Sequence, residues 1–115
     1  MDEKELLLKV AEYQGWPDCK VLSTGRLVAP NGIELPDFLW DLGVAVQLLY
    51  SLPDPIWFVL RSFECSDNFG CTICRPYDEG IEGWVHVESF SLARAATEAY
   101  CEAMDKLTEE AKKNG

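Results

Sequence analysis

The chain is poor in basic residues, and this shortage excludes one class of protein at the outset. Ten Lys and Arg residues stand against 20 Asp and Glu residues, so the formal net charge is −10. A surface this acidic repels the phosphates of DNA and RNA, and we expect no direct binding of nucleic acid. The charge itself has two interpretations: plain solubility, or an acidic face that occupies a basic surface on another protein.

Long apolar runs are also missing. The sequence contains no stretch of about eighteen apolar residues, so it predicts no membrane-spanning helix. Its opening, MDEKELLLKV, is acidic and lacks the basic start and long apolar core of a signal peptide. With 115 residues, 48% of them hydrophobic, we expect one folded domain over 1–115, located in the cytoplasm. Five cysteines without a secretory leader predict free thiols.

The order of the periodic segments predicts an α+β fold. Helices are predicted over 2–14, from Asp41 to Leu52 and from Ser91 toward the C-terminus. Apolar, aromatic and β-branched runs at 56–64, 69–75 and 83–88 predict an antiparallel meander. The predicted fold class is therefore α/β of the α+β type. A three- to four-stranded antiparallel sheet is flanked by two or three helices, in the order α-(loop)-α-β-β-β-α.

Three finer expectations concern burial and local structure. At the start of the 56–64 run both the odd-numbered and the even-numbered positions are apolar, so both faces of the strand would be apolar. This pattern is typical of a central strand. The segment 18–36 has no long period, so we expect an ordered loop with short extended pieces at 21–22 and 27–28. The residues of the second helix that we expect to face inward are Leu42, Ala45, Val46, Leu49 and Leu52.

The last helix has an inner face of small residues and an acidic outer face. The predicted inner face, which lets the helix lie close to a sheet, is Leu92, Ala96, Ala99, Tyr100, Ala103 and Leu107. Like charges at helical spacing cost some helix stability, so a stripe with only Lys106 nearby is a candidate partner face. That stripe consists of Glu98, Glu102, Asp105 and Glu109, with solvated surface as the alternative.

The cysteines and the single histidine give no specific catalytic or metal signal. Cys71 and Cys74 have metal-ligand spacing, but Thr72 and Ile73 between them indicate a strand, in which alternation sends the two sulfurs to opposite faces. We therefore predict buried free thiols and no metal site. His86 lies in an apolar strand without a recognisable nucleophile motif, which favours a structural or surface role.

Four tryptophans are many for a chain of this length. Burial in the core is their commonest use, because aromatic side chains remove large apolar areas from water. The functional alternative is a stacking platform with a phosphate clamp, since indoles stack on bases and guanidinium groups pair with phosphates. The candidate ligand-binding residues are Trp16, Lys20, Arg26, Trp40, Arg61, Arg75 and Trp84.

Several of these local features occur together in a known family. Gly15-Trp16 follows the first helix, Leu35-Pro36 precedes the helix start at Trp40-Asp41, Trp57 opens a strand, and 91–95 opens the last helix. In this order, across 6–107, the chain resembles the phage ABA sandwich domain family, which comprises small α/β domains encoded mainly by phages and prophages. The resemblance implies the fold and a phage origin, and it implies no specific reaction.

Two functions of different classes follow from the sequence, and neither needs a cofactor. The first is a non-enzymatic binding protein that sequesters a nucleotide-like signal of host defence in a pocket of tryptophan and arginine. The second is an acidic protein–protein inhibitor, or nucleic-acid mimic, that blocks a host defence protein through the acidic face of the last helix. Both would act in the bacterial cytoplasm during phage infection. Exposed edges of so small a sheet also favour homo-oligomers.

Overall fold

The computed structural model describes residues 2–53, 56–62, 68–75 and 84–114. Its helices are α1 (Glu3–Tyr13), α2 (Leu42–Tyr50) and α3 (Leu92–Asn114). Its strands are β1 (Lys20–Val21), β2 (Leu27–Val28), β3 (Trp57–Ser62), β4 (Phe69–Cys74) and β5 (Val85–Ser89). This order confirms the predicted α+β class and the antiparallel meander of β3, β4 and β5.

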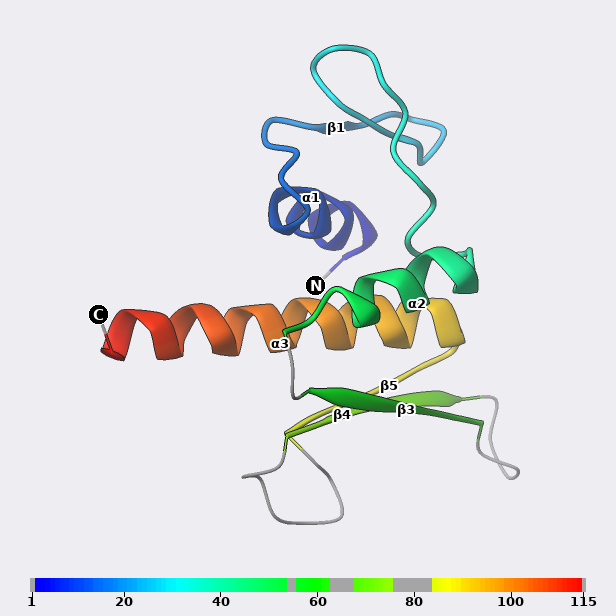
Figure 1. The fold of residues 1–115 in the computed structure, drawn as a ribbon. Coiled ribbons are helices and arrows are strands. Elements are labelled where there is room, and N and C mark those ends of the chain that lie inside the picture. Colours follow the sequence, from blue (N-terminus) through cyan, green and yellow to red (C-terminus); the bar gives the residue numbers. More distant parts are fainter. Residues whose placement is uncertain (1, 54–55, 63–67, 76–83, 115) are drawn as a thin grey trace.

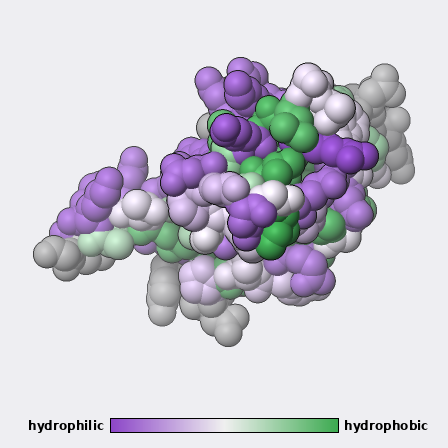
Figure 2. All heavy atoms as spheres, turned by 90° about the horizontal axis from the view of Figure 1, so that it is seen from above, coloured by the Kyte–Doolittle hydropathy of each residue, from purple (hydrophilic) through white to green (hydrophobic). Residues whose placement is uncertain are grey.

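Helix α3 lies in the middle of the molecule, between two layers (Figure 1). The sheet of β3, β4 and β5 covers one side of it, and α1 and α2 lie on the other. The small β1–β2 hairpin lies beyond α1, at the end of the molecule opposite the sheet. The C-terminal part of α3 projects past the rest of the molecule and is largely polar, as seen from above in Figure 2.

The ends of α1 are set by their sequence. Asp2 is the N-cap, because its Oδ1 accepts the Glu5 backbone N–H at 2.8 Å. At the other end Gly15 has φ +85°, and Trp16 N–H donates to the Ala11 carbonyl at 2.8 Å. A glycine in the left-handed region with this bond is a Schellman ending, which turns the chain sharply away from the helix. The predicted helix over 2–14 is thus confirmed together with both of its ends.

The position of β3 corrects one expectation. The strand order is β3-β4-β5, so β4 is central and β3 is an edge strand. Along β3 alternate residues are exposed, with Trp57 at 49% and Val59 at 38%, while Phe58 and Leu60 between them are half-buried under α3. The prediction of a central strand was wrong because a run of Trp, Phe, Val and Leu fits an edge strand equally well when its second face stays open. Residues 63–64 of that predicted strand lie outside the described residues.

The segment 18–36 is more regular than the expected loop. Lys20 and Val21 pair with Val28 and Leu27 in a two-stranded antiparallel sheet. Gly25 supplies a positive φ of +86° at the turn between the strands. A bridge from Val28 to Glu34 continues the pairing, so the hairpin and the segment that follows it hold together.

Helix α2 confirms its predicted start and corrects one predicted core residue. Asp41 caps it, accepting the Val44 backbone N–H at 3.2 Å. Ala45, Leu48 and Leu49 are buried, whereas Leu42 is 39% exposed because the first turn of the helix stands out from the core. Leu48 takes the place in the buried stripe that the sequence interpretation gave to Leu42.

Helix α3 is buried on two sides, which the predicted single inner face did not anticipate. The predicted Ala96, Ala99, Tyr100 and Ala103 are buried, and Leu92 and Leu107 are half-buried. Ala93, Thr97 and Cys101, on the side toward α1 and α2, are buried as well, and so is Ala95 beside the predicted face. The face expected to be open to solvent is therefore partly an interior surface.

One buried hydrogen bond joins α3 to the chain before α2. Thr97 is fully buried, and its hydroxyl donates to the Phe38 carbonyl at 2.5 Å. We expect Thr97→Val to lower the free energy of unfolding by about 1–3 kcal/mol, because the isosteric change leaves a buried carbonyl without a donor. Thr108→Val is the matched control: Thr108 is exposed on the same helix, and we expect a change within about 0.5 kcal/mol. Urea denaturation followed by circular dichroism measures both, and equal losses would show that the Thr97 bond contributes nothing specific.

Candidate functional site

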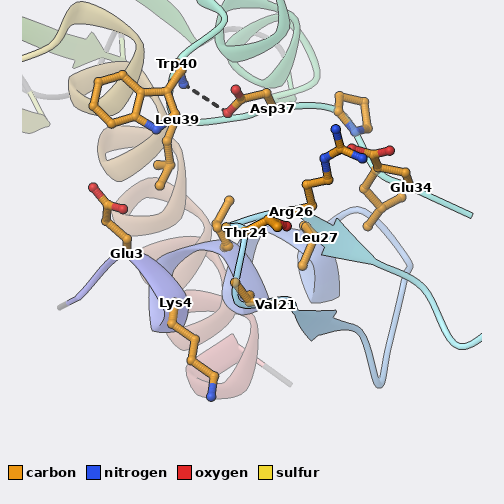
Figure 3. A pocket seen from close by; sticks show the side chains of 14 residues that line it. Glu3, Lys4, Val21, Thr24, Arg26, Leu27, Glu34, Asp37, Leu39 and Trp40 are labelled. Atoms are coloured by element: carbon orange, nitrogen blue, oxygen red, sulfur yellow. Dashed lines mark hydrogen bonds and ion pairs between the residues drawn. The ribbon is translucent and has the colours of Figure 1, made fainter.

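A hollow lies between α1, the β1–β2 hairpin and the chain from 34 to 40 (Figure 3). Its volume is about 580 Å³. It is lined by Glu3, Lys4, Leu7, Val21, Thr24, Gly25, Arg26, Leu27, Glu34, Leu35, Pro36, Asp37, Leu39 and Trp40. We call this hollow the hairpin cleft.

The hairpin cleft has an apolar base and an aromatic end. Leu7, Leu27, Leu35 and Leu39 are buried beneath it and belong to the main core. Trp40 stands at one end, with 62% of its surface exposed. A single exposed aromatic residue is common on protein surfaces, so what distinguishes Trp40 is its position beside this hollow.

The backbone before α2 holds Trp40 in place. Asp37 Oδ1 accepts the Trp40 backbone N–H at 3.2 Å, and Asp41 begins the next helix. The indole lies against Phe90, with ring centroids 6.2 Å apart and a tilt of 47°. Trp40 is therefore fixed at its backbone and supported at one edge, while most of its ring stays open to solvent.

The charges of the hairpin cleft are mixed. Arg26 and Lys4 supply positive charge, and Glu3, Glu34 and Asp37 supply negative charge. The Arg26 guanidinium points toward Glu34, with Nε 3.5 Å from Oε1, at the end of the cleft away from Trp40 (Figure 3). Both partners are more than half exposed, so this ion pair is weak and easily exchanged.

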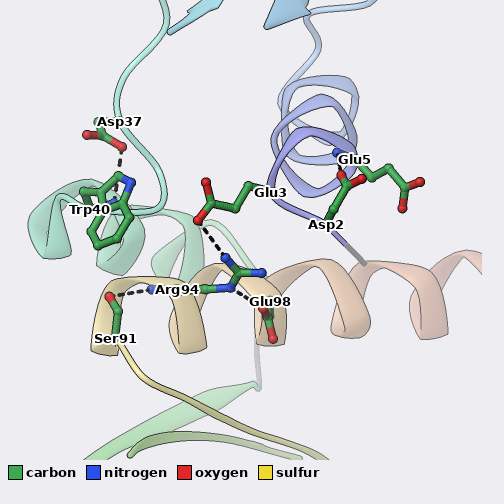
Figure 4. A network of polar contacts seen from close by, with 8 residues as sticks. All are labelled: Asp2, Glu3, Glu5, Asp37, Trp40, Ser91, Arg94 and Glu98. Atoms are coloured by element: carbon green, nitrogen blue, oxygen red, sulfur yellow. Dashed lines mark hydrogen bonds and ion pairs between the residues drawn. The ribbon is translucent and has the colours of Figure 1, made fainter. Parts of the chain in front are cut away.

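Glu3 also belongs to a network that fixes α1 on α3 (Figure 4). Arg94 Nη1 lies 3.0 Å from Glu3 Oε1, and Arg94 Nε lies 2.8 Å from Glu98 Oε1. The Arg94 side chain is only 14% exposed, so this network is better protected from solvent than the Arg26 pair. It ties the first turn of α1, which forms one wall of the cleft, to the central helix.

The structure brings two of the seven predicted ligand residues together. Arg26 and Trp40 line the hairpin cleft. Trp16 is half-buried against the core after α1, Lys20 is exposed on β1, and Arg61 is exposed on β3. None of these three lines the cleft.

The remaining two predicted ligand residues form a separate cluster beside the last helix. The Arg75 guanidinium carbon lies 4.0 Å from the centre of the Trp84 ring, and Arg75 Nη1 lies 2.9 Å from Glu110 Oε1. Lys106 Nζ donates to the Trp84 carbonyl at 2.8 Å. These contacts give Trp84 and Arg75 a role in fastening β4 and β5 to α3.

The acidic stripe of α3 is less open than expected. Glu98 pairs with Arg94, and Asp105 accepts contacts from both Lys9 and Tyr13 of α1. The expectation that only Lys106 lies near the stripe was wrong, because the packing of α1 brings Lys9 against it. Burial raises the Tyr13 pKa to about 12, with the Asp105 carboxylate adding to the effect.

Two members of that stripe remain exposed, namely Glu102 and Glu109. A smaller hollow of about 250 Å³ lies along the stripe between α1, α3 and β5. Its lining includes Glu98, Glu102 and Asp105 together with Cys101. The partner face of the sequence analysis is therefore only in part a free acidic surface.

The thiols of Cys71 and Cys74 do not converge. Cys71 is fully buried on the side of β4 that faces α3, while Cys74 is half-buried and pairs across the sheet with the exposed Trp57. Burial raises the pKa of the Cys71 thiol to about 12, and burial does the same for Cys101. Within the described part of the chain, no group of three or more His, Cys, Asp or Glu residues is placed to hold a metal ion.

His86 lies on the open face of the sheet in a cross-strand contact. Its Nδ1 is 2.8 Å from Thr72 Oγ1, and its Nε2 is 3.5 Å from Glu88 Oε1. This order of hydroxyl, imidazole and carboxylate follows from the pairing of Thr72 with His86 and from strand alternation. His86 is exposed, and it lines neither of the two hollows described above.

Sequence reasoning missed most of the hairpin cleft. Glu3, Lys4, Glu34 and Asp37 line it, and none of them is among the predicted ligand residues. No local pattern marks these four, because the cleft is made by contacts between segments far apart in the chain. Comparisons with protein-family models, with curated proteins and with solved structures found no match. None of the described helices is long and apolar enough to cross a membrane.

The burial of two thiols predicts their reactivity. We expect Cys71 and Cys101 to resist Ellman's reagent at pH 8 in the native protein, because a buried thiol with a raised pKa supplies little thiolate. All five cysteines should react once guanidinium unfolds the chain. Cys71→Ala and Cys101→Ala are the controls, since neither should change the native thiol count. If the number of thiols that react in the native protein is one lower in either variant, the prediction is contradicted.

The same groups predict a loss of stability at alkaline pH. Cys71, Cys101 and Tyr13 have folded pKa values of about 12, above their ordinary values of 9.0, 9.0 and 10.0. The native state therefore holds protons that the unfolded state releases first, so the free energy of unfolding is unaffected below pH 9 and falls between about pH 9 and 12. Each group contributes up to about 1.4 kcal/mol per pH unit. Urea titrations from pH 8 to 11 measure the slope, which should be shallower in Cys101→Ala.

Proposed function

We propose that the protein is a non-enzymatic binding protein that holds a nucleotide-like small molecule in the hairpin cleft. The observation that carries this proposal is the exposed Trp40 indole at one end of a hollow of about 580 Å³ with Arg26 near the other. Ligand pockets commonly have volumes of roughly 300–1,000 Å³. The cleft therefore suits one small molecule with a planar group at one end and an anionic group at the other.

Each end offers the chemistry that such a molecule needs. The open face of Trp40 can stack on a base, which is commonly worth about 1–3 kcal/mol. Arg26 can exchange its exposed pair with Glu34 for a bidentate contact to phosphate at small cost. Val21 and Pro36 also line the cleft and, unlike the buried leucines beneath it, supply accessible apolar surface for the sugar and the edge of the base.

The carboxylates of the cleft restrict the ligand further. Glu3, Glu34 and Asp37 oppose only two cationic side chains, so the cleft repels a highly charged polyphosphate. A ligand with one phosphate, or a cyclic phosphodiester, fits this balance better. Asp37, next to Trp40, is placed to accept an N–H from the base.

Binding without reaction is favoured by the lining itself. Among the described side chains the lining has no Ser, Cys or His, and its one hydroxyl group, on Thr24, is not hydrogen-bonded to a side chain that could take its proton. Among the carboxylates, Glu3 and Glu34 are engaged in ion pairs with Arg94 and Arg26. We accordingly retain a sequestering role for a host-defence signal in the bacterial cytoplasm, for which the support is the resemblance to phage ABA sandwich domains.

The alternative function as an acidic inhibitor has weaker support. Two of the four carboxylates of its proposed face, Glu98 and Asp105, already have cationic partners within the chain. Glu102 and Glu109 stay available, and charge reversal at both would weaken capture of a basic partner if this face were used. A ligand in the hairpin cleft would not have to break either of these two ion pairs.

Binding of nucleotides tests the proposal directly. Calorimetry with linear and cyclic nucleotide monophosphates should find at least one ligand, and Trp40→Ala should weaken its binding about tenfold or more. Trp57→Ala is the matched control, because Trp57 is also half-exposed but lies on β3, away from the cleft. We expect its affinity to equal that of the unchanged protein.

Two further variants separate the role of Arg26 from general charge. Arg26→Gln should weaken binding about tenfold, because it removes a charge-assisted hydrogen bond to phosphate. Glu34→Gln should instead strengthen binding severalfold, since it frees Arg26 and removes a negative charge. If no nucleotide binds, or if Trp40→Ala and Trp57→Ala behave alike, the cleft is not a nucleotide site.

A further inference from the structure

The free edge of β3 is the least protected edge of the sheet. In the described part of the chain β3 pairs only with β4, and its six residues include a single charged side chain, Arg61. Figure 1 shows this edge at the front of the sheet, with α3 above it. Natural proteins usually protect such an edge with charges, proline or a covering element, because unpaired backbone groups readily bind another strand.

Exposed apolar side chains gather at the same edge. Trp57 is 49% exposed, Val59 38% and Tyr50, at the end of α2, 70%. Tyr50 contacts Phe58 of β3 edge to face, with ring centroids 5.2 Å apart. Three of the eight large apolar residues that are exposed in the described chain therefore lie on β3 or against it.

The opposite edge of the sheet has the usual protection. β5 is five residues long and carries His86 and Glu88, both exposed. Charge is also distributed unevenly along the sequence, since between Leu42 and Leu60 the only charged residue is Asp54. The edge of β3 is thus the place where a chain with a net charge of −10 repels a second copy least.

We propose that two copies of the chain associate through β3, which pairs antiparallel with β3 of the partner subunit around a two-fold axis at Val59. The product is one continuous sheet with three strands from each copy. A closed two-fold arrangement uses the same surface on both subunits and leaves no free β3 edge. This inference does not depend on the ligand of the hairpin cleft, which lies at the other end of the molecule.

The occupant is a second copy because β3 is complementary to itself in this register. Around an axis at Val59, Trp57 lies opposite Arg61 of the partner subunit on the open face, where a cation can lie over an indole. On the helix-covered face Phe58 lies opposite Leu60 of the partner subunit, and both are half-buried apolar residues in one copy. Within the six residues of β3 no like charges meet, and Phe58, Val59 and Leu60 each gain an apolar neighbour.

The symmetry also fixes which residues can meet. A two-fold axis perpendicular to the sheet keeps the helices of both copies on one side, so residues on the open face of β3 pair only with residues on the open face of the partner's β3. Val59 is the one residue of β3 that lies opposite the same residue, Val59 of the partner subunit. The interface is small, so we expect dissociation constants in roughly the micromolar range.

The position of Val59 on the axis allows a sharp test with charged variants. V59K and V59E should each raise the dissociation constant of the dimer on the order of tenfold or more, because each places two like charges directly opposite one another. An equimolar mixture of V59K and V59E should restore a dimer, since opposite charges then face each other. L22K and L22E are the matched controls, because Leu22 is 47% exposed and lies between the strands of the distant hairpin.

Sedimentation velocity under reducing conditions, from about 5 to 500 µM, measures these outcomes. The unchanged protein and both Leu22 variants should approach twice 13.0 kDa as concentration rises. Circular dichroism establishes that the variants are folded, and W57K, which places a lysine opposite Arg61 of the partner subunit, replaces either Val59 variant that is not. The proposal would be overturned by a monomer at every concentration in the unchanged protein, or by V59K and V59E dimers as tight as the unchanged one. Dissociation caused by the Leu22 changes, or a V59K and V59E mixture that associates no better than either variant alone, would overturn it as well.

Discussion

The fold depends on the burial of α3 between a sheet and two helices. A helix with neighbours on both sides must be narrow, and Ala93, Ala95, Ala96, Ala99 and Ala103 provide that. Its charged residues are confined to the margins, where Arg94 and Asp105 bind Glu3 and Lys9 of α1. Small side chains set how closely the layers approach, and the ion pairs set where α1 lies along the helix.

This arrangement also builds the cleft. The pair of Arg94 with Glu3 fixes the start of α1, and the Schellman ending at Gly15 sends the chain away toward the hairpin. The bond from Thr97 to the Phe38 carbonyl then brings the chain before α2 back to the central helix. Three segments far apart in sequence are thereby held around one hollow, each by a contact to α3 or α1.

The sequence was informative where structure depends on neighbours in the chain, and uninformative where it depends on distant packing. Asp2, Gly15 and Asp41 mark helix ends through local hydrogen bonds and backbone angles, and all three were predicted. The edge position of β3 was not, because the same apolar residues suit a covered or an open face. Of seven proposed ligand residues only Arg26 and Trp40 meet, because strand order and helix packing decide which side chains converge. The prediction that Cys71 and Cys74 lie on opposite faces of one strand needed only the two-residue period of a strand, and it is confirmed.

The hairpin of β1 and β2 gives the cleft one compliant wall. Each of its strands is only two residues long, and Arg26 and Glu34 along it are joined by an exposed ion pair. A segment with so few paired backbone groups opens at a small fraction of the free energy needed to unfold the α3 core. The amides of 20–28 should therefore exchange with solvent by local opening, much faster than those of 95–103. We therefore expect any change in the width of the hollow to come from the hairpin and not from the core beneath it.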